Sequence, residues 1–204
     1  ALQALYREFE FKGLVAEETQ TSAAPPAAAE LPVAPVEQHY ETILDEADFE
    51  RWLEKLSASE LFAFDTETDG LDYMQAKVVG VSFAVTAGEA AYLPLAHDYL
   101  GAPAQLDRDT VLSRLKPLLE DPSKAKVGQH AKYDMNILAN CAIGGDQACG
   151  IMVQGVAYDT MLESYVLDST AQHRLDAIAA RYMHVSSLSY EDMCGKGANQ
   201  IPFA

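Results

Sequence analysis

"FAFDTETDGLD", residues Phe62–Asp72, joins an apolar run to a cluster of acids, and this order predicts the centre of the fold. The run Leu61–Phe64 has the composition of a short buried strand. The acids that follow within eight residues are Asp65, Glu67, Asp69 and Asp72. Carboxylates at the end of a buried strand repel one another and lose hydration, so a neutralising partner is expected beside them.

The composition is that of an acidic globular domain with additional segments. The chain has 204 residues, of which 49% are hydrophobic, and this is enough to form a core. Its net charge of −17 argues against a surface that binds nucleic acid through Lys and Arg that displace counterions. The charge is compatible with a nucleic-acid enzyme whose acidic pocket binds divalent cations, because the cations then supply the positive charge.

The cysteines and the apolar runs predict a cytoplasmic protein without a membrane partner. The three cysteines, Cys141, Cys149 and Cys194, form no CxxC pair and are typical of reduced thiols. No apolar run approaches the roughly 20 residues that span a membrane. The first residues also lack the layout of a signal peptide.

Composition divides the chain into three segments. Residues 1–14 resemble a fragment of a helix. Residues 15–38 are rich in Pro and Ala and contain no Lys or Arg, so we expect an interdomain linker there. The globular part is expected to begin at His39.

Apolar periodicity within the globular part predicts strands and helices in alternation. The predicted strands are the run that ends at Asp65, a hairpin of 77–85 and 89–95, a short strand that begins at Lys126, and 155–159. One predicted helix follows a cap at Asp45, and another opens at Thr160. The other predicted helices cover 108–120, about 132–141 and about 174–183. A hairpin followed by strand–helix alternation predicts an α/β fold, a mixed sheet with helices on both faces.

Several local features carry more detailed expectations. Pro117 should kink its helix or end it early, and Thr160 with Glu163 has the spacing of a capping box. The residues of the last helix expected to face inward are Leu175, Ile178, Ala179 and Tyr182. The residues expected to have structural roles are Asp69 and Asp72 in a solvated turn, His97 and Asp98, Asp159 as a cap or turn, and a turn at Gly195–Gly197.

The acids of the opening stretch are candidates for a metal site. Side chains at i and i+2 of a strand point the same way, so Asp65 and Glu67 can converge on one point while Thr66 is turned aside. Asp134, in the first turn of a helix that follows a strand, offers a third carboxylate. Such hard oxygen ligands suit Mg²⁺ or Mn²⁺, and two ions about 3.5–4 Å apart can promote phosphodiester hydrolysis.

A purely structural explanation of the same acids stays open. Asp65 would then cap the strand, Glu67 would be solvated, and Asp134 would be a helix N-terminal charge favoured by the helix dipole. An aspartyl phosphatase or an aspartic protease fits less well, because the first requires D-x-D and the chain contains no D-T-G.

Six stretches of the chain together resemble one known family. "FAFDTETDGLD", "AAYLPLAHDYL", "LKPLLED", "KVGQHAKYDMNILAN", "YDTMLESYVLDS" and "GKGANQ" are similar to the 3′–5′ proofreading exonuclease domain of bacterial DNA polymerase I, a member of the DEDD exonuclease superfamily, over residues 39–204. The resemblance implies an RNase H-like fold and removal of 3′-terminal nucleotides from single-stranded DNA with two divalent ions, Mg²⁺ or Mn²⁺, with Zn²⁺ as a third candidate. It also implies that residues 1–14 end a 5′-nuclease domain, that 15–38 connect it, and that a polymerase domain follows in the parent protein.

The resemblance also implies roles for individual residues. Asp65, Glu67 and Asp134 would be the catalytic metal ligands, and Glu67 would also help hold the attacking water and the terminal 3′-OH. Leu71 would be an apolar wedge against the terminal bases, and Tyr190 would contact a base. The full implied substrate-binding set is Thr66, Leu71, His130, Lys132, Tyr133, Met161, His173 and Tyr190.

The chain departs from the family pattern at three places. His130 stands where the second motif usually has Asn, and we expect altered substrate binding with catalysis retained. The third motif, a Tyr and a final Asp ligand on a helix after "GKGxNQ", is not matched before Ala204, so we expect a domain truncated before its last catalytic helix. Residues 144–155 are a longer insertion than the family predicts, and their Gly content predicts a surface loop.

Three functional hypotheses follow from the sequence. The first is a proofreading 3′–5′ exodeoxyribonuclease module, whose activity in this truncated chain is expected to be weak or absent. The second is a spacer or DNA-binding module without catalysis. The third is an RNA-trimming relative with the same carboxylates, which the linker and the polymerase-like stretches make less favoured.

Overall fold

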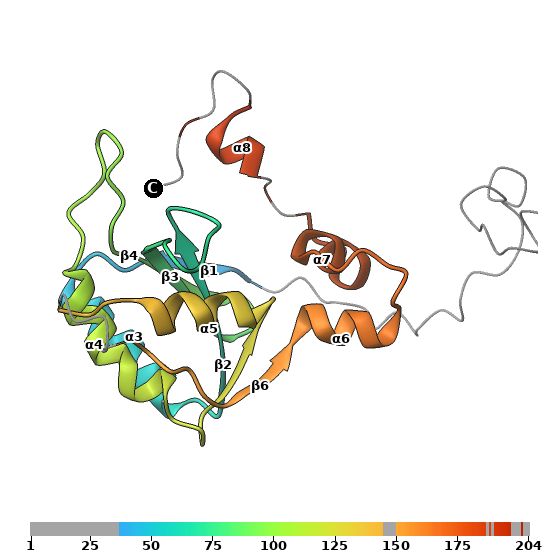
Figure 1. Cartoon of the computed structure of the whole chain (residues 1–204), viewed down its shortest axis with the longest axis horizontal. Coiled ribbons are helices and arrows are strands. Elements are labelled where there is room, and N and C mark those ends of the chain that lie inside the picture. Colours follow the sequence, from blue (N-terminus) through green and yellow to red (C-terminus); the bar gives the residue numbers. More distant parts are fainter. Residues whose placement is uncertain (1–36, 145–149, 187, 189, 197–200, 202–204) are drawn as a thin grey trace, which may run out of the picture. The chain divides into compact units, whose positions relative to one another are not determined.

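The structure, a computed structural model, describes residues 37–144, 150–186, 188, 190–196 and 201 (Figure 1). The expected end of a nuclease domain, residues 1–14, and nearly all of the expected linker lie outside this range. The strands are β1 (His39–Thr42), β2 (Leu61–Thr68), β3 (Val78–Thr86), β4 (Glu89–Pro94), β5 (Ala125–Gly128) and β6 (Val156–Asp159). The helices are α3 (Glu46–Ala58), α4 (Arg108–Leu119), α5 (Ala131–Asn140), α6 (Thr160–Leu167), α7 (Leu175–Met183) and α8 (Tyr190–Cys194).

The six strands form one mixed sheet in the order β1-β4-β3-β2-β5-β6. Strand β2 lies inside the sheet and pairs antiparallel with β3 and parallel with β5. Because β4 is antiparallel to β3, and β6 is parallel to β5, the carboxyl ends of β2, β4, β5 and β6 meet at one edge. Helices α5 and α6 both begin at this edge, each directly after its strand.

Helices α3 and α4 pack against the sheet and contact each other (Figure 1). Asp45 caps α3 as predicted, because its carboxylate accepts a hydrogen bond of 2.9 Å from the backbone N–H of Asp48. The buried side chains of these helices are Phe49, Trp52 and Leu56 on α3, and Val111, Leu112, Leu115, Leu118 and Leu119 on α4. None of the helices in the described ranges is long and apolar enough to cross a membrane.

One predicted strand was too short, and the expected early end of a helix at Pro117 does not occur. Strand β2 does not end at Asp65 but continues to Thr68, because its pairing with β3 continues through Glu67, which lies opposite Gly80. Helix α4 continues through Pro117 to Leu119. Pro117 lies in the last turn, where its missing N–H removes a single hydrogen bond, and the burial of Leu118 and Leu119 opposes an early end.

Two expectations about helix ends and loops are corrected. Asp159, not Thr160, is the N-cap of α6, so the expected capping box does not form, while the expectation of a cap at Asp159 is confirmed. Of the expected surface loop 144–155, residues 145–149 lie outside the described residues, and the segment 150–155 is not a surface loop, because Ile151 and Val153 join the core. The backbone N–H of Ile151 donates to the carbonyl of Leu138 at 2.8 Å, which holds the segment against α5.

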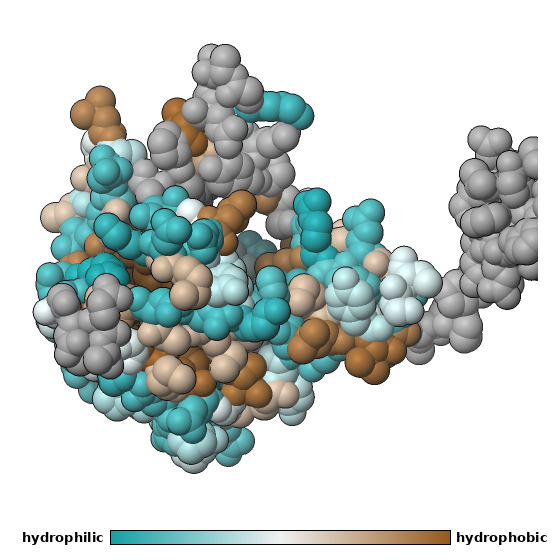
Figure 2. Space-filling view, viewed as in Figure 1, coloured by the Kyte–Doolittle hydropathy of each residue, from teal (hydrophilic) through white to brown (hydrophobic). Residues whose placement is uncertain are grey.

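The expected inward face of α7 is also wrong. No side chain of α7 is buried against the rest of the described chain, and Leu175 is 58% exposed. Figure 2 shows apolar surface over α6 as well, where the exposed residues are Leu162, Val166 and Leu167. The apolar periodicity of α7 is real, but a periodic face becomes core only where another element covers it.

Candidate functional site

The alternation of β2 separates buried from half-buried side chains. Phe62, Phe64 and Thr66 are buried, whereas Asp65 and Glu67 alternate with them and stay partly open to solvent. The two carboxylates therefore project from the same face of β2, as the sequence predicted. The register of β2 against β3 shifts between Glu67 and Thr68, which marks a β-bulge directly after the second carboxylate.

Asp134 reaches the site from the first turn of α5 and is only 3% exposed. Its Oδ1 accepts two hydrogen bonds from Thr66, one from the backbone N–H at 2.9 Å and one from the hydroxyl at 2.6 Å. The side chain of Thr66 was predicted to point away from Asp65 and Glu67, and it donates to Asp134 instead. Its direct contact with substrate stays a prediction.

The three carboxylates influence one another electrostatically. Burial, together with the charges of Asp134 and Glu67, raises the pKa of Asp65 to about 7. Burial and the charge of Asp134 raise the pKa of Glu67. Burial also raises the pKa of Asp134, against the two hydrogen bonds from Thr66, which act in the opposite direction. Raised pKa values in a group of carboxylates show that the site favours either protons or a cation.

The donor chemistry fits a hard divalent cation. All three side chains offer carboxylate oxygens, the ligands that Mg²⁺ and Mn²⁺ prefer. Both hydrogen bonds from Thr66 engage Oδ1 of Asp134, so Oδ2 lies outside that contact. Across the described ranges, no three His, Cys, Asp or Glu side chains are placed together at metal-binding distance. The structure therefore shows three carboxylates with raised pKa values, whereas a complete set of metal ligands stays a prediction.

The loop after β2 is anchored to α5 by Tyr133. The Tyr133 hydroxyl donates to the carbonyl of Gly70 at 2.8 Å and lies 2.9 Å from the hydroxyl of Thr68. Leu71, next in the loop, is 93% exposed. This arrangement leaves Leu71 free to contact a ligand, as its predicted wedge role requires. The acids of the loop, Asp69 and Asp72, accept hydrogen bonds from the backbone N–H groups of Lys77 and Met74, which confirms their place in a turn.

His130 and Lys132 flank the start of α5, and both are exposed. His130 adopts the left-handed conformation, with φ 59°, and its side chain makes no capping hydrogen bond. Its ring lies near that of Tyr133, with the centroids 6.4 Å apart. Both side chains are therefore open to a ligand at the carboxyl edge of the sheet.

The remaining predicted site residues belong to the segments after β6. Met161 is half-buried in α6. The His173 ring stacks on Tyr165 with centroids 3.5 Å apart, and its Nδ1 lies 2.9 Å from the Ser164 hydroxyl, so its observed contacts are structural. Tyr190 begins α8, and its side chain lies outside the described part of the structure.

Two residues near the site, Tyr92 and Asp159, make contacts that the sequence did not predict. Tyr92 of β4 lies over Gly80, which pairs with Glu67, and burial together with the charge of Glu67 raises the pKa of Tyr92. Its hydroxyl bonds to Nε2 of His97, which gives His97 the structural role expected of it. Asp159 contacts the first residues of α5 as well as those of α6. Neither the contact of Tyr92 with Gly80 nor that of Asp159 with α5 leaves a local sequence signal, because each joins elements that are distant in the chain.

Comparison with known proteins identifies relatives of the chain. A family profile described as 3′–5′ exonuclease matches residues 40–204. DNA polymerase I of Pseudomonas aeruginosa is 56% identical over 206 residues, a match that covers 100% of this chain and 22% of that protein. DNA polymerase I of Rhizobium leguminosarum is 38% identical over 182 residues, covering 80% of this chain and 17% of that protein. The chain thus spans about a fifth of the length of these relatives.

Solved structures show the same fold. Brucella melitensis NrnC with bound Mg²⁺ has a TM-score of 0.51 at 22% identity, over 76% of this chain and 65% of that one. The POL domain of Pol1 from M. smegmatis, in complex with DNA primer-template and dNTP, has a TM-score of 0.55 at 21% identity, over 71% of this chain and 23% of that one. These likenesses confirm the expected RNase H-like fold, a mixed central sheet flanked by helices.

Proposed function

Because the chain belongs to the 3′–5′ exonuclease domain family of DNA polymerase I, we propose that it removes nucleotides one at a time from the 3′ end of single-stranded DNA. In its parent protein it would edit primer ends for a polymerase domain on its C-terminal side. Residues 1–14 would end a 5′-nuclease domain, and 15–38 would be the connector. The relatives, in which the matched part is about a fifth of the protein, support this arrangement, and the expected location is the bacterial cytoplasm.

The observation that carries the proposal is the electrostatic coupling of buried and half-buried acids from two elements. Asp65 and Glu67 come from β2, and Asp134 comes from α5. Burial raises the pKa of each, and the charge of Asp134 adds to the rise for Asp65 and Glu67. A protein gains no stability from placing like charges together in a half-buried site. The arrangement is therefore better explained by a functional requirement for cation binding than by three independent structural acids.

Asp65, Glu67 and Asp134 would hold the divalent ions, two Mg²⁺ or Mn²⁺, with Zn²⁺ as the third candidate. Bound ions would supply positive charge for the phosphate and lower the barrier to attack by water. Hydrolysis forms a bond between the water oxygen and phosphorus and breaks the bond from phosphorus to the O3′ of the preceding nucleotide. Glu67, half-buried at the end of the site, would orient the water and the terminal 3′-OH.

The remaining side chains would hold the strand. Leu71 would press against the terminal bases from the loop that Tyr133 anchors to α5. Lys132 would contact the phosphate backbone, and His130 would donate a hydrogen bond to a phosphate in place of the usual Asn. Thr66, Met161, His173 and Tyr190 complete the proposed substrate-binding set.

The retained carboxylates favour catalysis over a purely binding role. A spacer module has no use for three acids whose ionised forms are destabilised by burial. A test would incubate the chain with 5′-labelled single-stranded DNA and Mn²⁺ and follow stepwise shortening from the 3′ end. Asp65→Ala should abolish shortening, whereas Glu54→Ala, which removes an exposed acid on α3, should leave it unchanged. Shortening by Asp65→Ala at the same measurable rate as by the unsubstituted chain would contradict the proposal.

The choice between DNA and RNA ends is tested in the same assay. Substrates that differ only in a terminal ribonucleotide would compare the two chemistries directly. Preference for the all-DNA strand is expected of a polymerase-associated module, and faster release of the ribonucleotide would support the RNA-trimming alternative.

A further inference from the structure

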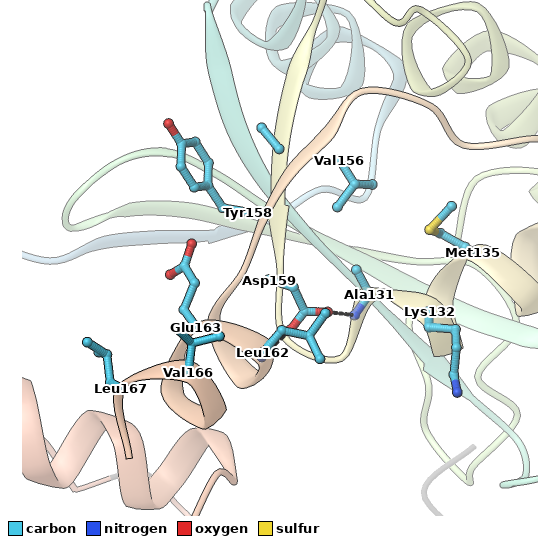
Figure 3. Close-up of a pocket in the computed structure, with 11 residues that line it drawn as sticks. Ala131, Lys132, Met135, Val156, Tyr158, Asp159, Leu162, Glu163, Val166 and Leu167 are labelled. Atoms are coloured by element: carbon cyan, nitrogen blue, oxygen red, sulfur yellow. Dashed lines mark hydrogen bonds between the residues drawn. The ribbon is translucent and has the colours of Figure 1, made fainter. Parts of the chain in front are cut away.

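One carboxylate holds the first turns of two helices. Asp159, the last residue of β6, accepts hydrogen bonds at Oδ1 from the backbone N–H groups of Met161 and Leu162, at 3.0 and 3.3 Å, and so caps α6. The same Oδ1 accepts from the backbone N–H of His130 at 3.1 Å, and Oδ2 accepts from that of Ala131 at 2.9 Å. Figure 3 shows the second of these contacts, where Asp159 and Ala131 meet in a groove between β6, α5 and α6.

Helix α5 depends on this contact because its own N-cap residue does not supply one. His130 occupies the N-cap position in the left-handed conformation, with φ 59°, and its side chain accepts no hydrogen bond from the helix. Non-glycine residues adopt this conformation at a cost, and surrounding contacts must maintain it. The backbone N–H of His130 points to Asp159, so the same carboxylate supports the unusual turn and satisfies the first donor of α5.

The helix end that Asp159 holds is the one that carries Asp134. Asp134 lies in the first turn of α5, four positions after His130 along the chain, so a shift of this turn moves its carboxylate directly. From the opposite side, Thr66 holds Oδ1 of Asp134 with two hydrogen bonds. The turn between β5 and α5 is further tied to the later segment, because Gln129 Nε2 donates to the carbonyl of His173 at 2.8 Å.

We propose that Asp159 is a positioning residue for Asp134, and that it fixes the first turn of α5 so that the third carboxylate meets those of β2. The role rests on the proposed function, since it assigns Asp159 to the metal site through Asp134. Asp159 itself is not a ligand, because its two oxygens are occupied by backbone donors of α5 and α6. Supporting groups of this kind typically change metal affinity by about 10–100-fold when they are altered.

Two substitutions separate this role from simple capping of α6. Asp159→Asn offers one acceptor oxygen where the carboxylate uses two, so it can serve only one of the two helices fully. Asp159→Ser keeps a good N-cap for α6 but has one shorter acceptor group, so it loses the contact of Oδ2 with the backbone N–H of Ala131. The matched control is Asp107→Asn at the start of α4, where a single oxygen accepts both hydrogen bonds from Thr110, so the amide can replace the carboxylate.

Titration calorimetry with Mn²⁺ on the 204-residue chain tests the proposal. Both Asp159 variants should bind Mn²⁺ at least about 10-fold more weakly, and Asp107→Asn should stay within about twofold of the unsubstituted chain. Unchanged Mn²⁺ affinity in both Asp159 variants would overturn the proposal. Thermal unfolding of each variant tests whether the chain is folded at the titration temperature. If Asp159→Asn is unfolded there, the comparison uses Asp159→Ser alone.

A metal-free measurement keeps this inference distinct from the proposed function. The backbone N–H of Thr66 donates to Asp134, so its NMR resonance and its hydrogen exchange report the position of that carboxylate. Both should change in Asp159→Ser and not in Asp107→Asn, even if the unsubstituted chain binds no Mn²⁺. An unchanged Thr66 signal in Asp159→Ser would refute the positioning role, whereas absent Mn²⁺ binding with a changed signal would count against the proposed function alone.

Discussion

Replacing Asp65 with Asn should flatten the pH dependence of stability in the metal-free chain. Burial and the charges of Asp134 and Glu67 raise the pKa of Asp65 from its ordinary 3.8 to about 7. Between these two pH values the folded chain retains a proton that the unfolded chain releases. The free energy of unfolding contributed by this group is therefore largest at low pH and falls as the pH rises toward 7.

The size of the effect follows from the two pKa values. At about 1.36 kcal/mol per pH unit, the rise in the pKa of Asp65 corresponds to about 4 kcal/mol in total, of which roughly 2 kcal/mol falls between pH 5 and pH 7. For a domain of this size that is a change in Tm of about 4–8 °C. Glu41 and Glu89, whose pKa values are lowered by hydrogen bonds from Arg51 and Lys55, contribute with the opposite sign. Their contribution is lost only below about pH 5, outside the chosen window, whereas Glu67 and Asp134, whose pKa values are also raised, add to the fall in stability within it.

The assay is thermal unfolding followed by circular dichroism in a chelating buffer across this window. The unsubstituted chain should lose stability toward neutral pH, and Asp65→Asn should lose much less. Glu54→Gln removes an exposed acid on α3 and should follow the unsubstituted chain. Parallel curves for Asp65→Asn and the unsubstituted chain would show that the three carboxylates do not repel one another as described, and the argument for a cation site would lose its electrostatic basis.

Three further predictions use the same protein. Excess Mn²⁺ should reverse the slope, so that Tm rises toward neutral pH, because the ion binds the deprotonated carboxylates; a slope that Mn²⁺ leaves unchanged would contradict this. Thr66→Val should lower the free energy of unfolding by about 1–3 kcal/mol in urea titrations, because Asp134 loses a donor, whereas Thr66→Ser should retain most of it; equal losses would show that the hydroxyl has no role. Gly80→Ala should lower the free energy of unfolding by about 1–3 kcal/mol, because a Cβ there would lie 2.0 Å from the Tyr92 hydroxyl oxygen. The same substitution combined with Tyr92→Leu should cost much less, and an undiminished cost would mean that the clash is not with Tyr92.

Local patterns predicted the elements that bury a periodic apolar face. The cap at Asp45 and the spacing of Phe49, Trp52 and Leu56 placed α3, and the two apolar runs on either side of Gly88 placed the hairpin of β3 and β4. These predictions succeeded because the pattern and the burial concern the same short stretch of chain. The apolar face of α7 was predicted to be buried and is not, since its burial depends on a covering element that the helix does not encode.

The D-x-E spacing and the family resemblance predicted Asp65, Glu67 and Asp134 as metal ligands from the sequence alone. Only the tertiary structure showed that Thr66 holds Asp134 and that burial and mutual repulsion raise the pKa of Asp65 to about 7. The sequence could predict Asp159 as a cap, because capping of α6 is local. Its contact with α5 joins residues that lie 28 positions apart in the chain, and that distance is closed only by the pairing of β5 with β6. Spacing along a strand or helix determines which side chains share a face, whereas the pairing of strands decides which faces meet.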